Sequence, residues 1–321
     1  MSADNADRIG VVLMAYGTPR GPEEIEPYYT DIRRGRPPTP EALADLVDRY
    51  DAIGGISPLA VLTEQQRDAL QAALDEQAPD RFHVTLGLKH ADPKVEAGAS
   101  ELTHAGYGSI VGLVLAPHYS SYSIGQYLQR ARDGVEQAGG STPVHGIESW
   151  ATEPEFVRFL ADDLRSRHDA MTSALADADD ERGVRVVFTA HSLPMRIIDA
   201  GDPYPDELRS TAEAVAAELR LTEGDDWMIG WQSAGRTPEP WIGPDILDVI
   251  DELGADPGVG GVIVSACGFV ADHLEVLYDL DIEARHRADD VGLLFDRTAC
   301  VNDDADVMSA LAARVIEAAS G

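Results

Sequence analysis

Seven short runs rich in valine, isoleucine and leucine constrain the fold of this chain more than any other feature. The runs do not alternate apolar and polar residues, which is typical of strands buried on both faces. Amphipathic stretches such as LTEQQRDALQAALDEQ separate them, and this alternation indicates parallel sheets covered by helices. The sequence therefore predicts an α/β fold. The runs span residues 9–17, 82–90, 109–120, 143–149, 184–192, 227–233 and 261–269.

Two passages of the chain are alike, which indicates that one structural plan is used twice. GLVLAPHYSS and RVVFTAHSLP each end an apolar strand in a small residue that is followed by His and Ser. At 321 residues the chain exceeds the usual size of one domain. We expect two similar lobes, residues 1–150 and 151–305. We also expect residues 306–321 to form a helix that packs back on the N-terminal lobe.

The net charge of the chain limits which classes of partner it can bind and indicates the environment in which it works. The net charge is −32, with 57 acidic against 25 basic residues, which argues against nucleic acids and anionic membranes as partners. An excess of Asp and Glu, only two lysines and 6% aromatic residues are typical of proteins from salt-loving organisms.

The sequence has neither an N-terminal stretch that resembles a signal peptide nor a run of about 18 apolar residues. We therefore expect a cytoplasmic monomer without stable membrane association.

Several common site types are excluded by their missing motifs. The glycine-rich stretches GYGSIVG and GVGGV precede their strands, and GxxxxGK[ST] and GxSxG do not occur, which argues against nucleotide binding and serine hydrolysis. The two cysteines, Cys267 and Cys300, cannot supply a four-cysteine iron–sulfur cluster within one chain. We interpret Cys267 as a small core residue in preference to a reactive thiol.

Polar residues follow several strands, where open parallel sheets bind their ligands. His191 ends one strand, and a lone histidine there is commonly a hydrogen-bonded structural residue. If it faces a carboxylate, the pair can bind Fe²⁺ weakly or accept a proton near neutral pH. Glu275, just after the last apolar run, could supply that carboxylate. Tyr16 follows the first strand as a packing residue or as a phenol directed toward a ligand.

The acidic stretch at 268–286, GFVADHLEVLYDLDIEARH, has two interpretations. In a regular helix Glu275, Asp279 and Glu283 would share one stripe, either as a solvated surface or as a ladder for a cation. His273 and Glu275 would diverge by about 200° on such a helix. Both can reach one site only if the helix starts late or is wound irregularly.

A second segment, RYDAIGGISPL at 49–59, contains a Gly-Gly turn and a Ser-Pro step. One interpretation is plain turn chemistry. The other is a fixed loop in which Arg49 and Ser57, with Arg33 from the preceding basic run, bind carboxylate groups, for which guanidinium is well suited.

Together these motifs resemble the ferrochelatases, especially the soluble bacterial type that acts on coproporphyrin III. The matching motifs include LMAYGTP, YYTDIRRGRPP, DRYDAIGGISPL, GLKH, VLAPHYSSYS, AHSLP, GDPYPDEL, GWQSAGRTPEPWIGPD and GFVADHLEVLYDLD, and they span residues 10–281 in the family's order. The resemblance implies two Rossmann-like lobes with the active-site cleft between them. It also implies insertion of Fe²⁺, as a substrate, into a porphyrin without an organic cofactor.

The resemblance further implies roles for individual residues. His191 matches the metal-binding and proton-accepting histidine and Glu275 its carboxylate partner, with His273 as a supporting group. Asp279 and Glu283 match an outer metal site, occupied by Mg²⁺ in some members, on a helix of π type. The positions that match porphyrin contacts are Tyr16, Arg33, Arg49, Tyr50, Ser57 and Tyr127.

Three alternatives to a coproporphyrin III enzyme stay open from the sequence. A protoporphyrin IX ferrochelatase would share the same motifs. A related chelatase that loads sirohydrochlorin with Co²⁺ or Ni²⁺ shares the fold but lacks GFVADHLEVLYD. A porphyrin-binding or metal-binding protein without catalysis would not require both His191 and Glu275.

Overall fold

The computed structural model describes residues 5–235 and 237–320, which form two compact units with one sheet each. Unit 1 comprises the described residues of 1–150, 271–273 and 302–321. Unit 2 comprises the described residues of 151–270 and 274–301. The chain thus crosses from one unit to the other more than once.

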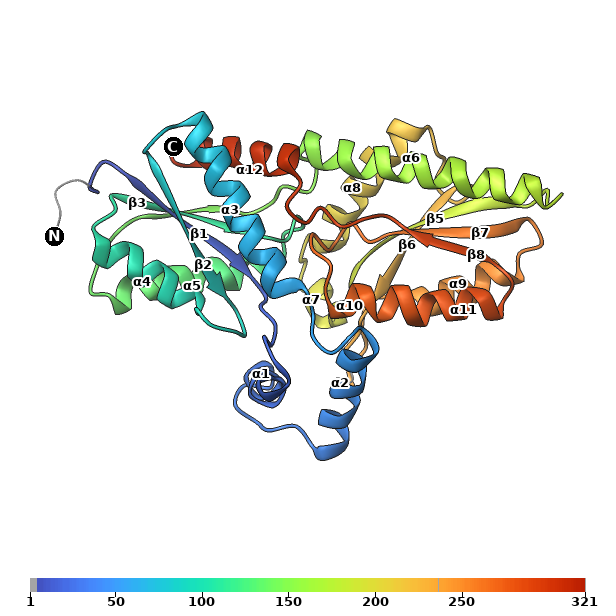
Figure 1. Cartoon of the computed structure of the whole chain (residues 1–321), viewed down its shortest axis with the longest axis horizontal. Helices are drawn as coiled ribbons and strands as arrows, with labels where there is room; N and C mark the ends of the chain where they lie inside the picture. Colours follow the sequence, from blue (N-terminus) through green and yellow to red (C-terminus); the bar gives the residue numbers. More distant parts are fainter. Residues whose placement is uncertain (1–4, 236, 321) are drawn as a thin grey trace. The chain divides into compact units, whose positions relative to one another are not determined.

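Unit 1 is a three-layer α/β arrangement around a parallel sheet of strand order β2-β1-β3-β4. Helices α4 and α5 lie on one side of the sheet, and α3 and α12 lie on the other (Figure 1). The strands are β1 (Ile9–Ala15), β2 (Phe82–Leu88), β3 (Ser109–Val114) and β4 (Val144–Ile147). The helices are α1 (Ile25–Ile32), α2 (Pro40–Ala52), α3 (Leu59–Gln77), α4 (Val95–Ala105), α5 (Ile124–Gln137) and α12 (Ala305–Ala318), with a 3-10 turn at Pro22–Glu24.

Unit 2 repeats this plan with a parallel sheet of strand order β6-β5-β7-β8. Helices α6 and α8 lie on one side of it and α9 and α11 on the other (Figure 1). The strands are β5 (Gly183–His191), β6 (Trp227–Gln232), β7 (Val259–Ser265) and β8 (Leu294–Arg297). The helices are α6 (Pro154–Asp177), α7 (Met195–Asp199), α8 (Tyr204–Leu219), α9 (Ile246–Ala255), α10 (Leu274–Leu277) and α11 (Arg285–Asp290), with a π-helix at Asp279–Ala284.

The prediction of an α/β fold with two similar parallel sheets is confirmed. Every residue of β1 and of β7 is buried, as expected for strands covered on both faces. In both sheets the first strand of the unit lies between the second and the third. This order places the carboxyl ends of β1 and β5 in the interior of their sheets.

Strand β8 is absent from the sequence prediction, for a physical reason. It is only four residues long and ends in Asp296 and Arg297. It lies at the edge of its sheet and pairs with β7 on one side. Charged residues are common on edge strands, where they obstruct pairing with other chains, but they also remove the apolar signal by which a strand is recognised.

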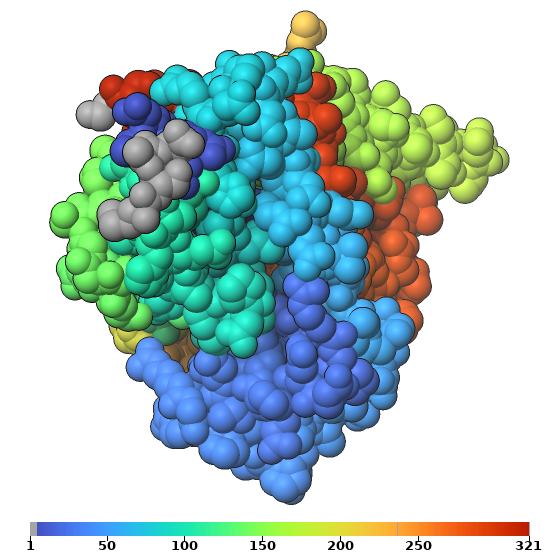
Figure 2. All heavy atoms as spheres, turned by 60° about the vertical axis from the view of Figure 1, so that its left-hand side comes forward, coloured from blue at the N-terminus to red at the C-terminus, as the bar shows by residue number. Residues whose placement is uncertain are grey.

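Two further segments complete unit 1. Helix α12 packs against α3, and Gln77 Nε2 donates to the backbone oxygen of Ser309 at 2.9 Å. The segment with α1 and α2 lies outside the layers of unit 1, at the bottom of the views in Figures 1 and 2. Helix α2 begins where the Thr39 hydroxyl accepts a hydrogen bond from Ala42 N at 3.3 Å. None of the helices in the described residues has both the length and the hydrophobicity needed to span a bilayer.

The loop after β7 approaches β5 closely at Gly268. Its N–H donates to Thr189 O at 3.0 Å, and a Cβ at this position would lie 2.4 Å from Ala190 Cβ. We expect Gly268→Ala to lower the free energy of unfolding by about 1–3 kcal/mol, because the backbone must shift to accept the methyl group. Urea unfolding measures this change.

Gly183→Ala is the matched control, because its added Cβ would meet ordinary contacts at 3.5 and 3.6 Å. We expect this variant to stay within about 0.5 kcal/mol of the wild type. Equal unfolding midpoints for Gly268→Ala and the wild type would contradict the close approach.

Candidate active site

A histidine and a glutamate face each other in unit 2. His191 is the last residue of β5, and Glu275 lies in the first turn of α10. His191 Nε2 and Glu275 Oε1 are 3.7 Å apart, and the side chains are 34% and 35% exposed. The structure therefore brings together the two residues predicted from the sequence as a pair, and both remain accessible to a ligand.

The other ring nitrogen of His191 fixes its tautomer. His191 Nδ1 lies 2.5 Å from the backbone oxygen of Ser192. Because a carbonyl oxygen only accepts, Nδ1 must carry the proton of the neutral ring. The Nε2 lone pair is then directed toward Glu275, so the ring can accept a proton or bind a metal ion there.

Gln232 ties this pair to the sheet. It ends β6 opposite His191 and is fully buried. Its Nε2 donates to the backbone oxygen of Glu275 at 3.2 Å, while its Oε1 accepts from the Thr189 hydroxyl at 2.9 Å. On the other side the Tyr204 hydroxyl donates to His191 O at 3.1 Å. Buried and satisfied amides of this kind hold the groups around them in one geometry.

These supporting roles were not predicted. Gln232 lies in the matched motif GWQSAGRTPEPWIGPD and Tyr204 in GDPYPDEL, but the sequence assigned neither residue a role. The register of β5 and β6 sets residue 232 beside residue 191, and spacing along the chain does not give that register.

The stretch 268–286 is not one regular helix. Helix α10 ends at Leu277, and the π-helix begins at Asp279, with Glu283 N donating to Tyr278 O at 3.0 Å. This bond spans five residues and widens the turn. A regular α-helical winding of this stretch is therefore wrong, and the π-type winding implied by the resemblance is confirmed.

Asp279 and Glu283 occupy different surroundings. Asp279 is only 8% exposed, and its Oδ2 accepts from the Ser233 hydroxyl at 2.5 Å. Glu283 is half-buried on the same π-helix. Within residues 5–235 and 237–320, no three His, Cys, Asp or Glu side chains are grouped so as to hold a metal ion. Mg²⁺ commonly keeps several waters and uses one or two carboxylates.

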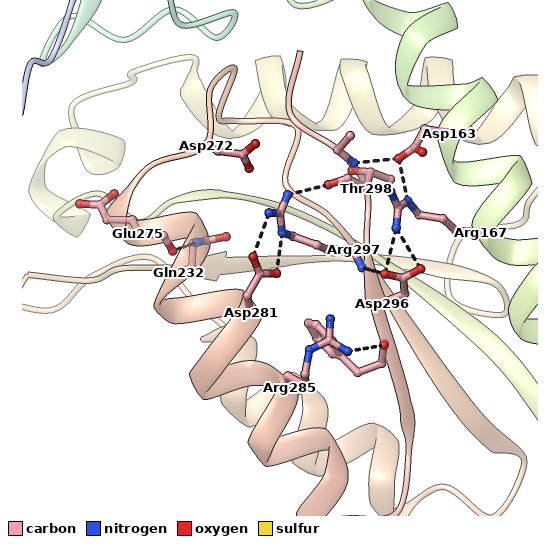
Figure 3. Close-up of polar contacts among 12 residues, drawn as sticks. Asp163, Arg167, Gln232, Asp272, Glu275, Asp281, Arg285, Asp296, Arg297 and Thr298 are labelled. Carbon is pink, nitrogen blue, oxygen red and sulfur yellow. Dashed lines mark hydrogen bonds and ion pairs between the residues drawn. The ribbon is translucent and has the colours of Figure 1, made fainter. Parts of the chain in front are cut away.

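Ion pairs anchor the π-helix to the edge of the sheet (Figure 3). Arg297 of β8 binds Asp281 through two hydrogen bonds of 2.7 and 2.9 Å and also donates to Thr298 O at 3.1 Å. Arg167 of α6 reaches Asp296 of the same strand at 2.9 Å. The short strand β8 thus holds the helix that follows Glu275.

His273 and Cys267 flank the loop before α10. His273 precedes the helix and belongs to unit 1, and its Nδ1 donates to Ala271 O at 2.9 Å. Cys267 is fully buried, and burial raises the pKa of its thiol to about 12. A thiol with that pKa is protonated at neutral pH, which agrees with a core residue.

Three of the predicted porphyrin contacts in unit 1 are buried. The Tyr50 hydroxyl lies 3.3 Å from the Thr18 hydroxyl, and Ser57 Oγ accepts from Leu59 N at 3.2 Å. Tyr127 is 3% exposed, and burial, followed by the neighbouring Tyr16, raises the pKa of its phenol. These side chains have fixed positions within the unit.

The other three predicted contacts are more accessible. Tyr16 is 43% exposed, and its ring centroid lies 4.6 Å from that of His90. Arg33 lies over the ring of Tyr29, at 5.6 Å from its centroid. Arg49 Nε lies 3.5 Å from an Asp45 carboxylate oxygen on the same helix. Both guanidinium groups are half-buried and remain partly accessible to an anion.

Comparisons with known proteins give the family and the fold. The family model described as Ferrochelatase matches residues 8–319. Coproporphyrin III ferrochelatase 1 of Bacillus anthracis is 46% identical over 296 residues, which cover 92% of each chain. Coproporphyrin III ferrochelatase of Bacillus subtilis is 42% identical over 311 residues, 97% of each. The structure titled SirB from Bacillus subtilis with Fe3+ matches with a TM-score of 0.52 and 12% identity, over 98% of this chain and 96% of SirB, which supports the fold alone.

The Arg297–Asp281 pair yields a testable prediction. Its side chains are only 14% and 30% exposed, so removing the guanidinium would leave a poorly solvated carboxylate. We expect Arg297→Met to lower the free energy of unfolding by about 2–4 kcal/mol, and Asp281→Leu combined with it to recover part of that loss. Urea unfolding of the single and double variants measures the coupling.

Arg287 and Asp251 form the matched exposed pair, with side chains 43% and 40% exposed. We expect Arg287→Met to cost less than about 1 kcal/mol. Equal losses for Arg287→Met and Arg297→Met would show that the Arg297 pair does not anchor the π-helix.

Proposed function

Because this chain belongs to the ferrochelatase family, we propose that it is a lyase that inserts Fe²⁺ into coproporphyrin III in heme biosynthesis. The product is Fe-coproporphyrin III. The observation that carries the mechanism is the geometry of His191, whose Nε2 faces Glu275 at 3.7 Å. The reaction requires no organic cofactor, and Fe²⁺ is a substrate.

The proton balance explains why this pair suits the reaction. A free porphyrin has two inner N–H groups, and both protons must leave as Fe²⁺ enters. The neutral His191 ring can accept one proton at Nε2, since its Nδ1 is already bound to Ser192 O. The Glu275 carboxylate stabilises the imidazolium and can accept the other proton, so that both protons have an acceptor. Imidazole with a carboxylate is also a donor set that suits Fe²⁺.

Residues of unit 1 are proposed to bind the porphyrin. Arg33 and Arg49 supply partly accessible guanidinium groups for propionates, and Tyr16 supplies an exposed ring for the macrocycle. Coproporphyrin III has four propionates and protoporphyrin IX has two. Binding of propionates by the Arg33 and Arg49 guanidinium groups therefore favours coproporphyrin III. The proposed contacts are Tyr16, Arg33, Arg49, Tyr50, Ser57 and Tyr127, with His273 as a supporting group near Glu275 in sequence.

The setting of the enzyme is proposed from its composition. A net charge of −32 with two lysines supports a protein from a salt-rich background. We also propose that it is a cytoplasmic monomer. High ionic strength would screen repulsion among its surface carboxylates. Assays in molar KCl therefore match the expected conditions.

Anaerobic metal insertion tests the proposed reaction. We expect the wild type to convert coproporphyrin III with Fe²⁺ in molar KCl, followed by the shift of the Soret band. His191→Ala should lower the rate by about 100-fold or more, because its proton acceptor is lost, while metal-free porphyrin still binds. His286→Ala, an exposed histidine on α11, is the control and should retain wild-type rates.

Two results would contradict this proposal. If the wild type metalates neither coproporphyrin III nor protoporphyrin IX, the chain is not a ferrochelatase. If it metalates only protoporphyrin IX, Fe²⁺ insertion is correct but the assignment of coproporphyrin III as the substrate is wrong.

The outer Mg²⁺ site at Asp279 and Glu283 is a separate proposal, supported by their position on the π-helix after Glu275. We expect the double variant Asp279→Ala, Glu283→Ala to lose Mg²⁺ stimulation of the rate while its affinity for coproporphyrin III changes by less than about twofold. Asp289→Ala with Asp290→Ala, at the exposed end of α11, is the control. If the Asp279→Ala, Glu283→Ala variant responds to Mg²⁺ like the wild type, these two carboxylates do not form a metal site.

A further inference from the structure

The only two lysines of the sequence lie five residues apart, at Lys89 and Lys94. Their electrostatic surroundings differ. Lys94 Nζ lies 3.1 Å from an Asp31 carboxylate oxygen, which neutralises it. Nearby, Arg130 is paired with Glu96 at 2.6 Å. Among the described residues, no carboxylate forms an ion pair with Lys89.

Lys89 lies instead among aromatic and cationic groups. Its Nζ is 5.2 Å from the centroid of the Tyr127 ring. Burial, and then the positive charges of Arg130 and Arg34, lower the pKa of its ammonium group to about 8. An ammonium ion that is partly buried beside like charges is destabilised unless an anion joins it. This arrangement is unusual in a chain whose net charge is −32.

The backbone fixes Lys89 next to residues already proposed as porphyrin contacts. Lys89 N donates to Ala15 O at 2.9 Å, and His90 N donates to Tyr16 O at 2.9 Å. Arg130 Nη1 donates to Lys89 O at 2.9 Å. The end of β2 is therefore held beside the end of β1, with the Lys89 side chain over Tyr127. All of these residues belong to unit 1.

We propose that Lys89 binds a propionate carboxylate of the tetrapyrrole, in addition to the contacts made by Arg33 and Arg49, and that Lys94 does not. This inference rests on the proposed function, because that function supplies the anionic ligand. The arriving carboxylate would neutralise a charge that the protein leaves unbalanced. Lys94 is already paired with Asp31, so a propionate would not neutralise an unbalanced charge there.

Porphyrin binding without metal tests this assignment. We expect Lys89→Met to raise the Kd for metal-free coproporphyrin III by about 10- to 100-fold, the usual range for losing a hydrogen bond to a charged group. Lys89→Arg should restore most of the affinity, and Lys94→Met should bind like the wild type. For coproporphyrin III tetramethyl ester, which has no carboxylates, Lys89→Met and the wild type should bind equally.

Chemical labelling tests the wild type without any substitution. An acylating reagent at pH 8 has only these two lysines and the chain's amino terminus as amines to modify. We expect saturating coproporphyrin III to slow acylation of Lys89 by about tenfold or more and to leave Lys94 unchanged, as measured by mass spectrometry of the peptides. Equal protection of both lysines, or of neither, would overturn the assignment.

The two proposals can fail separately. If coproporphyrin III binds and protects Lys89 but is never metalated, the proposed reaction is wrong and Lys89 remains an anion contact. If the wild type metalates coproporphyrin III while Lys89→Met binds it as tightly as the wild type, the Lys89 assignment is wrong.

Discussion

The buried amide of Gln232 is the interaction on which the candidate active site depends most. It bonds to Thr189 within the sheet and to the backbone of Glu275 outside it, so it links two strands to α10. Without this link, the register of β5 and β6 would position His191 alone. With it, a carboxylate is held opposite the imidazole, and the two groups are close enough to contact the same ligand.

The irregular helix after Glu275 is held by side chains at two points. Asp279 is held by Ser233 of the loop after β6, and Asp281 by Arg297 of β8. These anchors lie two residues apart along the chain. The π turn between Tyr278 and Glu283 lets the backbone satisfy both while its carbonyl groups remain hydrogen-bonded. Ion pairs and winding together give the segment after Glu275 a defined course (Figure 3).

Much of this arrangement could be predicted from sequence because it depends on strong local patterns. Continuous apolar runs identify buried parallel strands, and strand ends locate His191. Strand β8 was missed because four residues with two charges give no apolar signal. The role of Gln232 depends on strand register, and the unbalanced charge of Lys89 depends on where Asp31 and Glu96 lie in space. Neither can be inferred from spacing along the chain.

The central claim is that the neutral ring of His191 carries its proton on Nδ1, which donates to Ser192 O, and that Nε2 on the side of Glu275 is the proton acceptor. Long-range ¹⁵N–¹H NMR of histidine-labelled protein at pH 8, with His191→Ala to assign the resonances, tests it most directly. The account predicts the tautomer protonated at Nδ1 for His191. A ring protonated at Nε2 would contradict it, because the proposed proton acceptor would already be occupied.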